Sequence, residues 1–137
     1  MVTPGRTTPR KWVLVVDDNA RLRNLWIEVL EDAGYAAVGS EDGLAAAELI
    51  RDLMPDLILL DLRMPRASGM DFLENVRANP KWHDIPVVIV SAHIDEGPDP
   101  ALDAGLNIIG RMEKPVAVAD LLARVQQVIG PGEGAPE

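Results

Sequence analysis

Short runs of apolar residues, separated by segments with helical spacing, constrain the fold of this chain of 137 residues most strongly. The runs at 12–16, 57–60 and 86–90 contain no polar side chain. A strand of this kind is buried on both faces, as in parallel sheets that carry helices on both sides. Parallel strands are joined by right-handed crossovers, which are usually helices. The sequence therefore predicts an α/β fold built on a doubly wound parallel sheet.

Four helices are expected between and after these strands. The first contains apolar residues at helical spacing and ends at Gly34: Leu22, Leu25, Trp26, Val29 and Leu30. The second begins at Asp42-Gly43 and has an expected inner face: Ala46, Leu49, Ile50 and Leu53. The third spans 69–78 and ends at Asn79-Pro80. The last is amphipathic: Val118, Leu121, Leu122, Val125 and Ile129.

The remaining segments give weaker signals. A short second strand is expected at 35–38, and a weak fifth strand around Ile108 and Ile109. The segment 94–100 contains a glycine and two prolines, so any helix there is short or begins late. Residues 1–10 and 131–137 are expected to be flexible tails around one domain at 11–130.

Composition excludes several classes of function. The net charge of −9 argues against nucleic acid or an anionic membrane as a partner, because both require an excess of Lys and Arg. The chain has no cysteine, which excludes disulfides and thiolate metal sites. No apolar run approaches the length of a membrane span or a signal-peptide core, so a soluble cytoplasmic protein is expected.

Polar residues follow the predicted strands, at the point where each strand ends. Asp17 and Asp18 follow the first strand, Asp61 the central one, Ser91 the fourth and Lys114 the fifth. The carboxyl ends of parallel strands meet at one edge of the sheet, where open α/β folds bind their ligands. These five side chains are therefore expected to converge.

The chemistry of this set favours phosphoryl transfer. Three carboxylates crowd together near neutral pH only when a cation offsets their repulsion, and an all-oxygen set suits Mg²⁺. Asp61 is the expected nucleophile, because a carboxylate can attack phosphorus and become an aspartyl phosphate. The hydroxyl of Ser91 and the ammonium of Lys114 would then face the phosphoryl oxygens.

Each residue also has a plainer interpretation. One of Asp17, Asp18 and Asn19 is expected to cap the first helix. Ser91 could be an ordinary turn hydroxyl, and Lys114 a solvated surface lysine. It is less favoured that all five polar residues lie at strand ends by coincidence. The sequence therefore predicts a site that accepts a phosphoryl group.

Four ordered motifs resemble those of two-component response regulator receiver domains: Val15-Val16-Asp17-Asp18-Asn19, Leu60-Asp61-Leu62-Arg63-Met64-Pro65, Val90-Ser91-Ala92 and Glu113-Lys114-Pro115. The resemblance covers about residues 11–130. It implies the flavodoxin-like receiver fold, with five parallel strands in the order 2-1-3-4-5.

The resemblance also implies a role for each site residue. Asp61 would accept a phosphoryl group from a sensor histidine kinase or a phosphotransfer protein. Mg²⁺ would be bound directly by Asp18 and Asp61, by the backbone carbonyl of Arg63, and through water by Asp17. Ser91 and Lys114 would hold the phosphoryl oxygens, and the Lys114-Pro115 peptide is expected to be cis.

The chain departs from the family pattern on one face. The position three before the lysine is usually aromatic and here is Arg111. The segment between Gly105 and Lys114 is longer than usual, and prolines lie where the fourth helix would begin. Phosphoryl acceptance with an altered readout is therefore expected, although a solvated Arg111 without a specific role is the simpler interpretation.

Three functions remain open from the sequence. The leading one is a signalling switch, which catalyses only its own phosphorylation and dephosphorylation and is read by a downstream protein of unknown identity. A small phosphohydrolase would need a second acid as general base, and none lies between Asp61 and Met70. A phosphate-independent interaction module is the other alternative. Homodimerisation, and whether the domain belongs to a longer protein, are left open.

Overall fold

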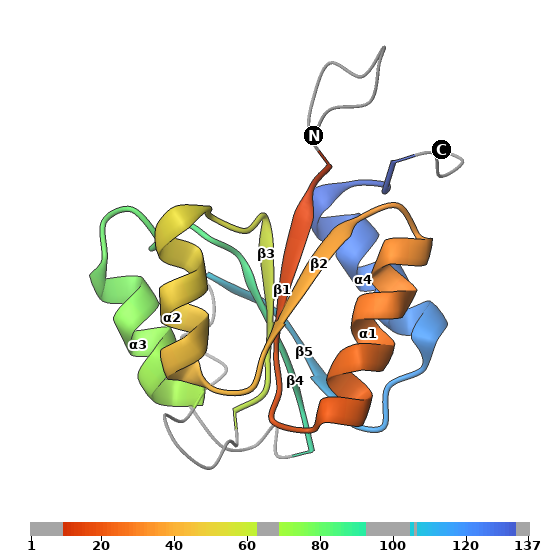
Figure 1. Cartoon of the computed structure of the whole chain (residues 1–137), viewed down its shortest axis with the longest axis horizontal. Helices are drawn as coiled ribbons and strands as arrows, with labels where there is room; N and C mark the ends of the chain where they lie inside the picture. Colours follow the sequence, from red (N-terminus) through yellow and green to blue (C-terminus); the bar gives the residue numbers. More distant parts are fainter. Residues whose placement is uncertain (1–9, 63–68, 93–104, 106, 134–137) are drawn as a thin grey trace.

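The computed structural model describes residues 10–62, 69–92, 105 and 107–133, and these form a sheet flanked by helices on both faces (Figure 1). The sheet has five strands in the order β2-β1-β3-β4-β5, and every pairing is parallel. The strands are β1 (Trp12–Val16), β2 (Ala36–Ser40), β3 (Leu57–Leu60), β4 (Val87–Ser91) and β5 (Ile108–Glu113). The predicted fold class and strand order are confirmed.

Four helices cover the sheet within the described residues: α1 (Ala20–Asp32), α2 (Gly43–Asp52), α3 (Gly69–Ala78) and α4 (Val118–Ile129). α1 and α4 lie on one face, and α2 and α3 lie on the other (Figure 1). The segment 94–100, in which a short or late helix was expected, lies outside the described residues. No helix of the described part is long and apolar enough to cross a membrane.

The alternation of side chains along each strand divides the core into two layers. Leu14 and Ile58 point toward the layer that contains α2 and α3, whereas Val13 and Leu59 point toward α1 and α4. Both layers are fully buried around β1, β3 and β4, whose residues are at most 9% exposed. The continuous apolar runs in the sequence are explained by this burial on both faces.

Two predicted core positions of α2 are wrong. Leu49 is 37% exposed and Leu53 is 65% exposed, whereas Ala46 and Ile50 are buried as expected. Leu53 also ends the helix with an extended backbone (φ −152°, ψ 119°). Helical spacing alone gave these leucines to the core, but they lie on the side of α2 that faces solvent.

Three strands differ from their predicted bounds. β4 was expected at 86–90 and is shifted by one residue, to Val87–Ser91. β2 was expected at 35–38 but spans Ala36–Ser40; Tyr35 lies just before it, and its hydroxyl donates to the carbonyl oxygen of Gly130 at 2.6 Å. β5 is longer than expected and contains an irregularity: Val87 pairs with Ile108, but Val88 pairs with Gly110. This β-bulge at Ile109 accommodates one extra residue. Beyond the bulge, Ser91 pairs with Glu113.

The chain after α4 returns to the end of α1. The amide of Glu133 donates to the carbonyl oxygen of Gly34 at 2.9 Å, so residues 131–133 lie against the turn before β2. Gly34 adopts φ +96°, and a Cβ there would lie 2.2 Å from the carbonyl oxygen of Glu133. Residues 1–9 and 134–137 lie outside the described part, and the predicted tail and domain bounds stay predictions.

Candidate functional site

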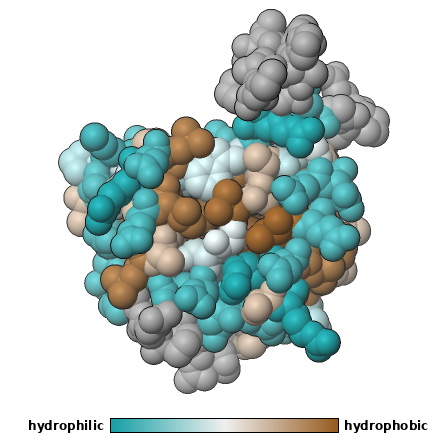
Figure 2. Space-filling model, in the orientation of Figure 1, coloured by the Kyte–Doolittle hydropathy of each residue, from teal (hydrophilic) through white to brown (hydrophobic). Residues whose placement is uncertain are grey.

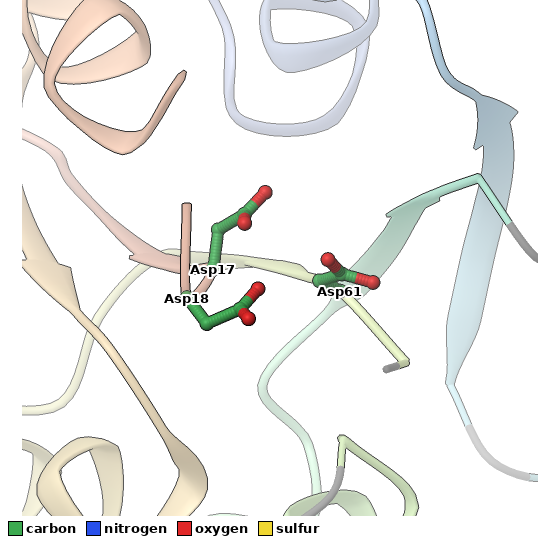
Figure 3. A group of neighbouring side chains, drawn as sticks. All are labelled: Asp17, Asp18 and Asp61. Carbon is green, nitrogen blue, oxygen red and sulfur yellow. The ribbon is translucent and has the colours of Figure 1, made fainter. Parts of the chain in front are cut away.

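The structure brings the predicted acids together at the carboxyl edge of the sheet. Asp17 and Asp18 follow β1, Asp61 follows β3, and their carboxylates face a common region (Figure 3). One oxygen from each of the three lies within 4.8 Å of the others. Asp17 and Asp61 are buried, at 3% and 7% exposure, whereas Asp18 is exposed. The convergence arises because β1 and β3 are neighbours in a parallel sheet.

Asn19, rather than Asp17 or Asp18, is the N-cap residue of α1. Its side-chain oxygen accepts a hydrogen bond from the amide of Leu22 at 3.1 Å, which is the geometry of an N-cap. The amide of Asn19 in turn donates to Oδ1 of Asp17 at 2.9 Å. The carboxylates of Asp17 and Asp18 are therefore available to the site, and Asp17 is held in place by the backbone.

Lys114 lies between two of the acids. Its Nζ is 2.6 Å from Oδ2 of Asp17 and 3.1 Å from Oδ2 of Asp61. The lysine side chain is 17% exposed, so the contact is largely shielded from solvent. The Lys114-Pro115 peptide bond is cis, as the family resemblance implied. The alternative of a solvated surface lysine does not describe this side chain.

Ser91 is the last residue of β4 and is fully buried. Its Oγ donates to Oδ1 of Asp61 at 2.9 Å, while its carbonyl oxygen accepts the amide of Lys114 at 3.0 Å. The two oxygens of Asp61 therefore contact different partners, Ser91 and Lys114. This serine is part of the site rather than an ordinary turn residue.

The pKa values of Asp17 and Lys114 reflect this packing. Burial raises the pKa of Asp17, and the hydrogen bonds from Lys114 and from the amide of Asn19 oppose that rise only in part. Burial acts to lower the pKa of Lys114, but the hydrogen bonds and charges of Asp17 and Asp61 outweigh it, so this pKa is raised. Lys114 is thus held as an ammonium beside the acids.

The donor set fits a hard divalent cation. The three grouped acids offer only carboxylate oxygens, which is the ligand type that Mg²⁺ prefers. One ammonium can offset only one of the three negative charges that the ionised acids carry. An excess of negative charge therefore remains at the edge of the sheet. Arg63, whose backbone carbonyl was the remaining predicted ligand, lies outside the described residues.

Gly69 is a site residue that sequence reasoning missed. It begins α3, and a Cβ at this position would lie 2.3 Å from the carbonyl oxygen of Asp61 and 2.7 Å from Cα of Leu62. Its amide donates to the carbonyl oxygen of Leu62 at 3.2 Å. The glycine was assigned only to the start of a helix, because nothing in a single sequence indicates which backbone approaches it.

Arg111 lies on β5 and is half-buried, opposite Ile89 of β4. It occupies the position where an aromatic residue was expected from the resemblance. In the sequence it lies between the bulge at Ile109 and Lys114.

Comparison with known proteins agrees with this geometry. Residues 13–126 match the family described as the response regulator receiver domain. The chain belongs to this family. The match covers β1 through most of α4 and includes the residues grouped at the site. The predicted family membership is therefore confirmed.

Two bacterial proteins are examples of relatives that match most of this chain. The polar-differentiation response regulator DivK of Brucella anthropi is 28% identical over 120 residues, which is 88% of this chain and 97% of that protein. A protein-glutamate methylesterase/protein-glutamine glutaminase of Xanthomonas oryzae pv. oryzae is 44% identical over 106 residues, which is 75% of this chain. The matched part is only 29% of the methylesterase, so the chain spans less than a third of that relative.

Solved structures show the same fold. The chemotaxis protein CheY4 of Vibrio cholerae has a TM-score of 0.76 at 26% identity, covering 88% of this chain and 99% of the other. The non-phosphorylated HemR receiver domain of Leptospira biflexa has a TM-score of 0.76 at 27% identity, covering 93% and 98%.

Proposed function

We propose that the chain is a phosphorylation switch, in which Asp61 accepts a phosphoryl group from a histidine kinase or a phosphotransfer protein. The single observation that carries this proposal is the environment of the Asp61 carboxylate, which contacts the hydroxyl of Ser91 and the ammonium of Lys114. Membership of the receiver family supports the same assignment. The protein would act in the cytoplasm, where such kinases present their phosphohistidine.

In the proposed reaction an oxygen of Asp61 attacks the phosphorus atom. The phosphorus–nitrogen bond to the donor imidazole breaks as the new phosphorus–oxygen bond forms. Lys114 and Ser91 already lie within 3.1 Å of the carboxylate, so each can shift its hydrogen bond to an oxygen of the transferred group. The chain would catalyse only its own phosphorylation and the later hydrolysis.

Asp18 and Asp61 would bind Mg²⁺ directly, Asp17 through water and Arg63 through its backbone carbonyl. The ion, when bound, supplies positive charge that stabilises the phosphoryl oxygens as the group is transferred. Asp18 is the exposed member of the acid group and is absent from the contacts of Lys114, so its main proposed role is to bind the metal.

Magnesium is expected to stabilise the folded protein against heat, because it binds only where the three acids are assembled. At a concentration of about 100 times the Kd, the gain in unfolding free energy is about 2.7 kcal/mol. Asp18→Asn should lose most of this gain. Thermal unfolding with and without MgCl₂ measures it, and Asp52→Asn, which removes an exposed acid of α2, is the matched control. Equal stabilisation of the Asp18 variant would contradict the assignment.

Incubation with Mg²⁺ and acetyl phosphate separates the three functions that the sequence left open. A switch should take up one phosphoryl group per chain and release it slowly, as measured by intact mass and by free phosphate. Continuous release of phosphate over many turnovers would favour the phosphohydrolase, and no uptake would favour the phosphate-independent interaction module. Asp61→Asn should abolish uptake in the first two cases.

The downstream partner is proposed to be a protein rather than nucleic acid or a membrane, because the net charge is −9. The face around β5 carries Arg111, at the position where the resemblance implies an aromatic residue, and the bulge at Ile109. We therefore expect the partner that reads this face to differ from those of receivers with an aromatic residue at that position.

A further inference from the structure

The outer edge of β2 is unprotected within the described residues. β2 is the first strand of the sheet and pairs only with β1 there. Its sequence, Ala36-Ala37-Val38-Gly39-Ser40, contains no charged residue and no proline. Soluble proteins usually protect an edge strand with charge, proline or a bulge, because its open hydrogen-bonding groups can pair with another chain.

The hydrogen bonds to β1 show which backbone amides and carbonyls of β2 point away from the sheet. The amide of Ala36 donates to the carbonyl oxygen of Lys11 at 2.9 Å, and the carbonyl oxygen of Ser40 accepts the amide of Asp17 at 3.0 Å. Backbone groups alternate in direction along a strand, so those of residue 38 also face β1. The amides and carbonyls of Ala37 and Gly39 therefore point away from the sheet.

An apolar surface surrounds this edge. Figure 2 shows hydrophobic residues across the face between α1 and α2, with hydrophilic residues around them. Val38 of β2 is 40% exposed, and Leu49, Leu53 and Met54, in and after α2, are 37%, 65% and 47% exposed. Val38 points to the side of the sheet that carries α2, because Ala36, two residues before it, packs in that layer.

We propose that this edge is a dimer interface, in which β2 pairs antiparallel with β2 of a second copy and makes one continuous sheet through both molecules. With Val38 on the two-fold axis, Ala37 lies opposite Gly39 of the second copy, and both present outward-facing amides and carbonyls. The register of hydrogen bonds thus matches the direction of these groups. Any shift of one residue would place inward-facing groups against outward-facing ones.

The distribution of charged residues on α1 favours a second copy of this chain as the partner of β2. A Cβ on Gly39 would lie 2.8 Å from Cδ of Arg23 and 2.8 Å from Cδ1 of Ile27, so these side chains lie over β2. Exposed Glu31 follows four residues later on the same stripe of α1. In an antiparallel arrangement centred on Ile27, Arg23 faces Glu31 of the second copy, and Glu31 faces its Arg23.

This arrangement satisfies the requirement of a two-fold interface, in which residue i contacts residue j and residue j contacts residue i. The stripe has its basic residue four positions before Ile27 and its acidic residue four positions after it. The side chain of Arg23 is also positioned, because its Nη1 donates to the carbonyl oxygen of Asp17 at 2.8 Å. An unrelated extended peptide would not be expected to carry charges that match this symmetric pattern of Arg23 and Glu31.

Disulfide trapping tests the register directly, because the chain has no cysteine of its own. In the proposed dimer, Val38 and Val38 of the second copy form a non-hydrogen-bonded pair of antiparallel strands. The Cα atoms of such a pair are about 4.5 Å apart, a distance that a disulfide can span. Val38→Cys should therefore form a covalent dimer on mild oxidation. Ile109→Cys is the matched control, since Ile109 is 38% exposed and lies on the strand at the opposite edge of the sheet.

Sedimentation equilibrium measures the association without a cross-link. We expect a concentration-dependent dimer that Val38→Lys weakens by at least 10-fold in Kd, while Ile109→Lys leaves the Kd unchanged. Glu31→Lys should also weaken it, and the double variant Arg23→Glu/Glu31→Lys should restore it. A wild-type chain that stays monomeric, or cross-linking of both cysteine variants to the same extent, would overturn the proposal. Asp61→Asn should dimerise normally, which separates this test from that of phosphorylation.

Discussion

Replacing Lys114 with Met is expected to slow phosphorylation of Asp61 by acetyl phosphate by about 10²–10³-fold, the usual effect of removing one preorganised group that stabilises charge in the transition state. The ammonium lies 3.1 Å from Oδ2 of Asp61 and can follow the phosphoryl oxygens as they gain charge. Methionine has similar bulk but no charge. The rate of uptake at saturating Mg²⁺, measured by intact mass, gives the comparison.

The same variant should be less stable when no metal is present. Removing one partner of a buried ion pair costs about 3–5 kcal/mol, because the other partner remains buried without compensation. Here Asp17 and Asp61 are 3% and 7% exposed, and both contact Lys114. Urea unfolding in EDTA measures this loss, and Mg²⁺ should return more stability to Lys114→Met than to the wild type.

Lys81→Met is the matched control for both measurements, since Lys81 is an exposed lysine. It should change neither the rate of uptake nor the midpoint of unfolding. If Lys114→Met takes up phosphoryl groups at the wild-type rate, the proposed role of this lysine in the reaction is wrong. A loss of stability without a loss of rate would limit its role to holding Asp17 and Asp61.

Gly69→Ala is expected to destabilise the fold by about 3 kcal/mol, at the upper end of the usual cost of inserting a methyl group into a packed region. The new Cβ would lie 2.3 Å from the carbonyl oxygen of Asp61, and this neighbour is backbone, which cannot move without displacing the end of β3. Phosphoryl uptake should fall as well, because the Asp61 carboxylate moves with its backbone. Urea unfolding and the acetyl phosphate assay measure the two effects.

Gly110→Ala provides the control for this substitution. Gly110 lies in β5, and the nearest atom to its added Cβ is Nη1 of Arg124 at 3.0 Å, the end of a flexible side chain. This variant should stay within about 1 kcal/mol of the wild type, since a side chain can rotate away. Equal destabilisation by the two substitutions would show that the contact between Gly69 and Asp61 has no special importance.

The sequence predicted the sheet because its strands are buried on both faces. β1 and β3 were predicted with their observed bounds, since each is a continuous apolar run. α3 was also predicted with its observed bounds, because Asn79-Pro80 ends it. The bulge in β5 could not be predicted, since it depends on how Ile108 and Gly110 pair with β4. Leu49 and Leu53 were misplaced because helical spacing does not show which apolar stripe lacks a neighbour.

The members of the site were predictable from topology, but their contacts were not. A residue after each parallel strand must reach the same edge, so the placement of Asp17, Asp61 and Lys114 follows from the strand order. Which oxygen of Asp61 contacts Ser91 and which contacts Lys114 depends on side-chain geometry. The approach of Gly69 to the backbone of Asp61 depends on tertiary packing in the same way.

The central claim is that Asp61 becomes an aspartyl phosphate, and chemical mapping of the modified residue tests it most directly. After incubation with Mg²⁺ and acetyl phosphate, borohydride reduces an aspartyl phosphate to homoserine, which peptide sequencing by mass spectrometry can locate. We predict homoserine at position 61 alone, formed only when Mg²⁺ is present. Modification at Asp17 or Asp18 instead, or no modification of the folded chain at any Mg²⁺ concentration, would contradict the account.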